Sequence, residues 1–275
     1  MSESNPDPGS AAGETGDPVR VLPIESPGTE SSWVKRAQLV FVVALALWLV
    51  TLTSLVTIAT WSHPHLRATI GMGWGLILFW VFIGGGLMRL FRNRIRGAVL
   101  ALPGDWRLKF ILLATVLVLI EEAITTTMTN LAPVFGVNIG EAYITASTNY
   151  WDVIALHSVV VIMPMFVGWA LILWRYDFSP FEVFLLFGMT GTLAECSFGF
   201  KHLLEFGMWI FVYGLMVYLP SYSIPRERKK RSPRWWHYPL AIVAPFVFIP
   251  IVPLPLIAGL LYPHHPSIHF PPITG

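Results

Sequence analysis

The sequence predicts an all-α protein: a polytopic transmembrane bundle of about seven helices, with the N-terminus in the cytoplasm and the C-terminus outside. Three observations predict this fold class. Of the 275 residues, 55% are hydrophobic and only 12% are charged, about half the charged fraction of a usual soluble domain. Seven apolar stretches approach the roughly 20 residues needed to cross a ~30 Å hydrocarbon core. Lys and Arg gather in every second connection between these stretches.

The first 32 residues are expected to form a disordered tail. They are rich in Pro, Gly and Ser, and they contain six acidic residues against one basic residue, Arg20. Such a segment cannot bury enough apolar surface to offset its ordering entropy. No basic stretch followed by a short apolar run begins the chain, which argues against a cleaved signal peptide. We therefore expect a tail over 1–32, a transmembrane helical domain over 33–262, and a short Pro- and His-rich tail over 263–275.

The expected spans follow from hydropathy and from helix-breaking residues. Only a tight turn at Gly199–His202 separates the fifth span from the sixth, and one helix over both would be far too long for a bilayer, so a hairpin is predicted. The last span contains five prolines and is expected to be kinked or locally broken. The seven spans are placed near 37–60, 70–90, 108–129, 151–174, 180–200, 203–222 and 238–261.

The distribution of Lys and Arg predicts the orientation. Most of them fall in connections on one side of the membrane, whereas Arg67 and Lys201 fall on the other. The positive-inside rule makes the basic side cytoplasmic. The run from Arg226 to Arg234 is interpreted as a topogenic loop on anionic lipid, with a partner site as the alternative. The expected partner is the lipid bilayer and not nucleic acid, and the expected location is the cell (plasma) membrane.

Five ionisable side chains are predicted to reach the outer half of the membrane: Glu121, Glu122, His157, Glu195 and His202. A rise of 1.5 Å per residue places Glu121 roughly 18 Å from the cytoplasmic end of its span and His157 about 8–9 Å below the outer surface. Charged groups at such depths cost several kcal/mol each. Adjacent carboxyl groups in a low dielectric cannot both ionise cheaply, so one is expected to keep its proton. One carboxylate could then take a proton from water while the other donates one.

Each of these residues also has a purely structural interpretation. The glutamate pair could be protonated and hydrogen-bonded to Thr125 and Thr126, one turn further on, as a helix-packing device. His157 could be an interhelical hydrogen-bond donor. Glu195 follows Gly188 and Gly191 on one small-residue face, which suits close helix packing as well as a site. His202 could belong to a solvated hairpin tip.

Two short motifs lie in this part of the sequence. The run 121–126 begins with the glutamate pair and ends with Thr126. The run 198–202 reads Phe-x-x-x-His, and Phe206 follows four residues later. Val153 stands four residues before His157.

A glutamate pair in one membrane helix, followed by single histidines in later helices, resembles the glutamate intramembrane proteases. These are the CAAX-processing and bacteriocin-processing (Abi) proteins and the PrsW group, whose pattern is Glu-Glu-x-x-x-Arg, then Phe-x-x-x-His, then His with Asn or a small residue four further on. The resemblance covers about 108–206 and lacks the Arg and the Asn. It implies that Glu121 or Glu122 activates water, that His157 and His202 bind the oxyanion, and that the substrate is a membrane protein or peptide.

The same residues leave other functions open. Glu122, His157, Glu195 and His202 are an alternative ligand set for a divalent metal such as zinc. They would also suit a proton- or metal-coupled transporter or an ion-binding protein. A non-catalytic multi-pass protein, in which the cluster only fixes helix packing, is a third interpretation. The connection 130–150 could cover the site as a lid or be an ordinary connector. The leading prediction is a membrane-embedded hydrolase of the glutamate-protease type, as the resemblance implies. The sequence has no His-Glu-x-x-His motif, which argues against a zincin-type protease, and it has no P-loop or dinucleotide fingerprint.

Overall fold

The computed structural model describes residues 31–197, 199–228 and 230–248. The described chain is 79% helical and contains no strands, which confirms the all-α prediction. Three of its helices are long and apolar enough to cross a membrane: Ser32–Ala59, Pro64–Ala101 and Ser158–Arg175. They support the prediction of a membrane protein, while the count of seven spans stays a prediction. The predicted tails, apart from Ser31 and Ser32, and the end of the last span lie outside the described residues; Ser32 is the first residue of the first helix.

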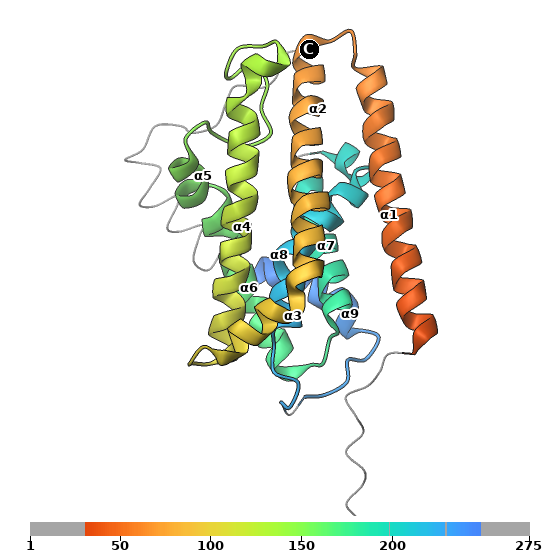
Figure 1. Ribbon diagram of the computed structural model, residues 1–275, viewed down its shortest axis with the longest axis vertical. Coiled ribbons are helices and arrows are strands. Elements are labelled where there is room, and N and C mark those ends of the chain that lie inside the picture. Colours follow the sequence, from red (N-terminus) through yellow and green to blue (C-terminus); the bar gives the residue numbers. More distant parts are fainter. Residues whose placement is uncertain (1–30, 198, 229, 249–275) are drawn as a thin grey trace, which may run out of the picture.

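The helices surround one another in a bundle with α1 at one edge and α5 at the other (Figure 1). In chain order they are α1 (Ser32–Ala59), α2 (Pro64–Leu76), a π-helical segment (Ile77–Gly84), α3 (Gly85–Ala101), α4 (Trp106–Asn130), a 3-10 turn (Ala132–Phe135), α5 (Tyr150–Leu156), α6 (Ser158–Arg175), α7 (Pro180–Cys196), a 3-10 turn (Phe200–Leu203), α8 (Phe206–Tyr222), α9 (His237–Val243) and a 3-10 helix (Ala244–Phe248).

The second helical run is longer than the predicted span 70–90. α2, the π-helical segment and α3 form 38 continuous residues, about 57 Å at 1.5 Å per residue and well beyond a ~30 Å core. The arginines from Arg89 to Arg96 therefore lie on the last turns of a helix that leaves the membrane, not in a loop. Trp80 fastens this run to α8, because its indole Nε1 donates to the Val212 carbonyl at 3.1 Å.

The fourth predicted span, 151–174, is two helices. The chain breaks at His157, where φ is −130° and ψ is −86°, so α5 ends and α6 begins on either side of this residue. The break lets α5 pack across α4, where the Tyr150 hydroxyl donates to the Leu119 carbonyl at 2.7 Å. It also lets the Ser158 hydroxyl reach Glu122 of α4. These contacts compensate for the helical hydrogen bonds that are lost.

α7 and α8 form the predicted hairpin, and glycines allow their backbones to approach closely. A Cβ added at Gly188 would lie 2.7 Å from the Ile210 carbonyl oxygen, and one at Gly214 would lie 2.6 Å from the Phe184 carbonyl oxygen. Small residues at such positions are typical of membrane helix pairs. The small-residue face that was expected on α7 is therefore used for packing against α8.

The hairpin is shorter than its neighbours. α7 and α8 have 17 residues each, about 26 Å, whereas α1 has 28. The turn lies beside the middle of α1, because the Trp48 indole donates to the Leu204 carbonyl at 3.1 Å. Trp48 is 11 residues from Ala59, so the tip lies about 17 Å short of that end of α1 (Figure 1). The polar residues of the turn are therefore deeper than the sequence predicted.

The described part of the last predicted span is a short α9 followed by a 3-10 helix. The change occurs at Ala244, next to Pro245, whose missing N–H cannot continue the α-helical pattern. This agrees with the predicted local break. α9 is held to α7 by Thr190, whose hydroxyl donates to the Ile242 carbonyl at 2.8 Å.

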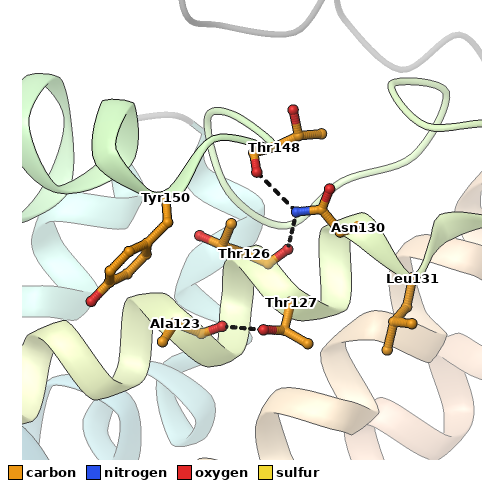
Figure 2. Close-up of a pocket in the computed structure, with 7 residues that line it drawn as sticks. All are labelled: Ala123, Thr126, Thr127, Asn130, Leu131, Thr148 and Tyr150. Carbon is orange, nitrogen blue, oxygen red and sulfur yellow. Dashed lines mark hydrogen bonds between the residues drawn. The ribbon is translucent and has the colours of Figure 1, made fainter.

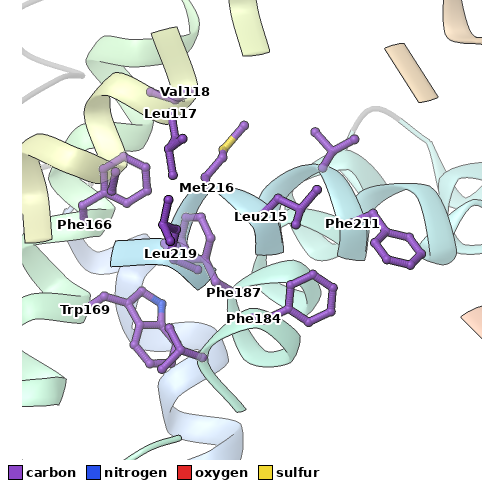
Figure 3. Packing of buried hydrophobic residues seen from close by; sticks show 14 of the residues in the cluster. Leu117, Val118, Phe166, Trp169, Phe184, Phe187, Phe211, Leu215, Met216 and Leu219 are labelled. Atoms are coloured by element: carbon purple, nitrogen blue, oxygen red, sulfur yellow. The ribbon is translucent and has the colours of Figure 1, made fainter. Parts of the chain in front are cut away.

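Aromatic and aliphatic side chains of α4, α6, α7 and α8 form the core of the bundle (Figure 3). Phe166, Trp169 and Phe187 are fully buried, and the rings of Phe166 and Phe187 are in contact, tilted by 48° with their centroids 5.6 Å apart. Leu117 and Val118 bring α4 into the same cluster. This packing fixes the rotation of α4, so the glutamate pair in the next turn faces the bundle interior.

Part of the basic run from Arg226 to Arg234 folds back onto the connection between α6 and α7. Lys230 Nζ lies 2.5 Å from an oxygen of Asp177, and Arg228 donates to the Leu173 carbonyl. The interpretation of this run as a lipid-facing loop is therefore incomplete, since two of its described cations make contacts within the protein.

Candidate functional site

The glutamate pair is buried in the bundle. Glu121 is 4% exposed and Glu122 is 6% exposed, and the threonines one turn further on, Thr125 and Thr126, are 5% exposed each. The pair lies nine and eight residues from Asn130, about 12–14 Å below that end of α4. The ends of α4 and α1 stand at similar heights (Figure 1), so the pair and the tip of the α7–α8 hairpin share nearly the same depth.

Hydroxyl groups from three parts of the chain bind Glu122. The Thr125 hydroxyl donates to Glu122 Oε2 at 3.1 Å. Ser158, at the start of α6, and Thr145, in the connection after α4, also hydrogen-bond to this carboxyl group. The sequence predicted Thr125 and Thr126 as partners, because both lie one helical turn from the pair. Thr125 is confirmed, whereas the Thr126 hydroxyl has no hydrogen-bond partner among the described residues. Ser158 follows His157 directly, so the helix break is what delivers it.

Glu195 of α7 joins the glutamate pair. It lies close enough for its charge to interact with those of Glu121 and Glu122. The Tyr213 hydroxyl of α8 donates to Glu195 Oε1 at 2.6 Å. The structure therefore brings three of the five predicted side chains together: Glu121 and Glu122 come from α4, and Glu195 comes from α7.

Tyr213 is a site residue that the sequence analysis missed. Its ring passes directly over Gly191, where an added Cβ would lie 2.1 Å from Tyr213 Cδ2. Gly191 stands four residues before Glu195, on the same face of α7. A glycine one turn before a membrane glutamate, with a tyrosine in the following helix of a hairpin, was the available signal.

His202 lies in the 3-10 turn between α7 and α8. Its Nδ1 is 2.7 Å from Glu205 Oε2, and its ring contacts that of Trp209 with centroids 6.0 Å apart. Its charge interacts with that of Glu195. The side chain is 19% exposed, so the turn is not the fully solvated tip that was the alternative interpretation.

His157 occupies the break between α5 and α6 and is half-buried. The predicted metal site of Glu122, His157, Glu195 and His202 is not formed. No three His, Cys, Asp or Glu side chains in the described chain come together closely enough to hold a metal ion. The physical reason is that the oxygen and nitrogen donors are engaged by protein groups: hydroxyls bind Glu122, Tyr213 binds Glu195, and Glu205 binds His202.

A cavity of about 340 Å³ opens beside the glutamate pair at the Asn130 end of α4. Figure 2 shows its lining. Asn130 Nδ2 donates to the carbonyls of Thr126 and Thr148 at 2.9 Å each, which ties the connection 136–149 to α4. Tyr150 lines the cavity and lies close enough to Glu122 for their charges to interact. The connection is thus packed against α4 next to the buried carboxyl groups. The lining residues are Ala123, Thr126, Thr127, Asn130, Leu131, Thr148 and Tyr150.

Comparison with protein-family models, with curated proteins and with solved structures found no match for this chain. The function of the site is therefore inferred from its geometry alone. Two buried carboxyl groups, together with the half-buried Glu195 and Tyr213, can hold and exchange protons, and the nearby cavity gives space for a small reacting group.

Proposed function

We propose that the protein is a multi-pass integral membrane hydrolase of the glutamate type, acting on an amide or ester bond that lies within the membrane. The observation that supports it most is that the buried pair Glu121 and Glu122 lies near the half-buried Glu195 and Tyr213, and near a cavity. Burying two adjacent carboxyl groups without a use for them is costly.

In this proposal Glu122 is the general base, because two residues near it line the cavity: Thr126, one helical turn further on, and Tyr150, which interacts with Glu122 electrostatically. A water oxygen adds to the carbonyl carbon of the substrate while Glu122 takes a proton from that water. The bond from carbon to the leaving nitrogen or oxygen then breaks, and the leaving atom receives the proton. Glu121 holds the second proton of the pair. His157 remains the candidate for binding the oxyanion. His202 is a positioning residue in this proposal, because it interacts electrostatically with Glu195.

The proposed topology has about seven spans in the plasma membrane, an N-terminus in the cytoplasm and a C-terminus outside. The start of α4 lies beside the basic loop, since the Arg228 guanidinium stacks 4.9 Å from the Trp106 ring centre. Arg92 of α3 reaches the Tyr218 hydroxyl of α8 at 3.2 Å. These contacts support a single basic side. Labelling of single cysteines with a membrane-impermeant maleimide, in a Cys196→Ala background, tests this arrangement.

The test of hydrolysis compares cells that carry the wild type with cells that carry Glu121→Gln, Glu122→Gln or Glu227→Gln. Glu227 is exposed in the basic loop and serves as the matched control. New protein N-termini and released lipid products are quantified in the membrane fraction. Loss of a general base should reduce product formation by about 10²–10⁴-fold. Wild-type product levels in both Glu121→Gln and Glu122→Gln, at equal protein levels, would disprove the proposal.

Proton-coupled transport is a second candidate function, favoured by one specific observation. A series of titratable groups runs from the buried pair through Glu195 and His202 to Glu205, whose side chain is 37% exposed. Such series relay protons in pumps and transporters. Proteoliposomes with an internal pH dye test it: Glu195→Gln should abolish a proton flux that the wild type supports. A wild type without any flux removes this candidate.

A further inference from the structure

We propose that the cavity at the Asn130 end of α4 binds the ester region of an outer-leaflet phospholipid, whose acyl chain lies along α4. As a binding site the proposal stands on the cavity alone. Its extension, that this ester is the substrate bond, rests on the proposed hydrolase function.

The first observation is a buried hydroxyl that faces the cavity. Thr126 is 5% exposed, and its Oγ1 has no hydrogen-bond partner among the described residues. In Figure 2 its side chain lies between Tyr150 and Asn130. The Thr127 hydroxyl, by contrast, donates to the Ala123 carbonyl at 2.6 Å. Thr126 can therefore donate to a ligand, and a carbonyl oxygen is the matching acceptor.

The second observation is the neutral lining of the cavity. The lining residues that the structure describes are threonines, an asparagine, a tyrosine and aliphatic side chains, without a formal charge. A phosphate or an ammonium group would find no opposite charge there. The neutral ester of a lipid fits this chemistry, and the charged headgroup would extend past Leu131 towards water.

The third observation is an exposed apolar stripe that leads to the cavity along α4. Leu108, Leu112, Val116 and Ile120 recur every four residues and are 56%, 55%, 48% and 48% exposed. Ile120 and Val116 lie about 9 and 15 Å below Thr126, within the ~15 Å of one leaflet, and Leu112 and Leu108 continue the stripe towards the cytoplasmic end of α4. A polar pocket at one end and an apolar track below it match the polarity of an outer-leaflet lipid. A transmembrane peptide would need apolar contacts on both sides of the pocket.

The size of the cavity also favours a lipid over a helical peptide. A sphere of about 340 Å³ is about 9 Å across, less than the 10–12 Å diameter of a helix with its side chains. An ester carbonyl bound to Thr126 would lie one helical turn from Glu122. Water would add to the ester carbon as Glu122 takes its proton, and the glycerol oxygen would leave with that proton. The products are a fatty acid and a lysophospholipid.

The test is photo-crosslinking of the full-length protein in nanodiscs with a phosphatidylcholine that carries a diazirine in its acyl chain close to the ester carbonyl. Labelled peptides are mapped by mass spectrometry. Ala123→Trp fills the cavity and should reduce labelling around 120–131 at least fivefold. Thr126→Val removes only the hydroxyl and should reduce it about threefold. Thr115→Val is the matched control, because the Thr115 hydroxyl is bonded within its own helix to Ile111 at 2.8 Å.

Labelling that is even along α4 and unchanged by Ala123→Trp would mean annular lipid only and would overturn the site. Labelling of the cavity by a diazirine-bearing transmembrane peptide, but not by the lipid, would overturn it in favour of a peptide ligand. Release of fatty acid is measured in the same nanodiscs. Cavity labelling without release by the wild type would overturn the substrate assignment while the binding site stands.

Discussion

Replacing Gly191 with alanine should both destabilise the α7–α8 hairpin and displace Tyr213 from Glu195. The new methyl carbon would lie 2.1 Å from Cδ2, 2.2 Å from Cγ and 2.7 Å from Cβ of Tyr213. Favourable carbon contacts are at about 3.5–4.0 Å. Turning the tyrosine ring cannot relieve the contact with its Cβ, which moves only with the backbone of α8. The two helices must therefore separate by about 1 Å, or Tyr213 must leave its place.

The magnitude follows from three effects on the free energy of unfolding. Overpacking of this kind costs about 1–3 kcal/mol. Losing the hydrogen bond from Tyr213 to the Glu195 carboxyl group costs about 1.5–3 kcal/mol. The greater helix preference of alanine returns about 0.5–1 kcal/mol. Gly191→Ala should therefore lower the free energy of unfolding by about 2–5 kcal/mol.

The matched control is Gly86→Ala in α3, where an added Cβ would meet nothing within 4 Å. This substitution should stabilise the protein by about 0.5–1 kcal/mol. Both variants are unfolded with SDS in mixed micelles and followed by circular dichroism. Tyr213→Phe, alone and combined with Gly191→Ala, separates packing from the lost hydrogen bond in a double-mutant cycle. A Gly191→Ala protein as stable as Gly86→Ala would refute the packing of α7 against α8 described above.

Two further predictions concern the starts of helices. Ser179→Ala should cost about 1 kcal/mol in the same unfolding assay, because the Ser179 hydroxyl accepts the Glu182 N–H at 3.2 Å and the Glu182 carboxylate accepts the Ser179 N–H at 2.7 Å; an unchanged midpoint would contradict this cap. At the start of α4, hydrogen bonds from the Arg107 side chain and then its backbone N–H lower the pKa of Asp105 to about 2. The unfolded value is about 3.9, so this stabilisation is present above about pH 4 and is lost as the pH falls towards 2. The melting temperatures of wild type and Asp105→Asn should therefore converge over that range, and a constant difference down to pH 2 would contradict the assignment.

Most of the helices could be predicted because length and hydropathy are properties of one continuous segment. α1 and α4 begin and end within a few residues of the spans expected near 37–60 and 108–129. The hairpin followed from the turn at Gly199–His202. The extension of the second run to Ala101 did not, because arginines are equally typical of a loop and of a helix that emerges into water.

The break at His157 could not be predicted for a different reason. The segment around it is apolar enough to continue as one helix, and Pro164, further along, lies inside α6 without ending it. The break is stabilised by contacts with α4, which are contacts between segments distant in the sequence. Local helix preference therefore yields to tertiary hydrogen bonds at this point.

The site residues divide in the same way: those that one segment identifies were predicted, and the one that depends on a contact between two helices was missed. Glu121, Glu122 and Glu195 could be predicted because a carboxyl group in an apolar span is costly wherever its neighbours lie. Tyr213 could not, because a tyrosine in a membrane segment is also typical of an interface anchor. Its role depends on the register in which Gly191 meets α8. If that register carries the site, the pair Gly191→Ala and Tyr213→Phe should recover neither packing nor activity. Phenylalanine keeps the Cβ, Cγ and Cδ2 atoms that the new methyl group would meet, and it lacks the hydroxyl that binds Glu195.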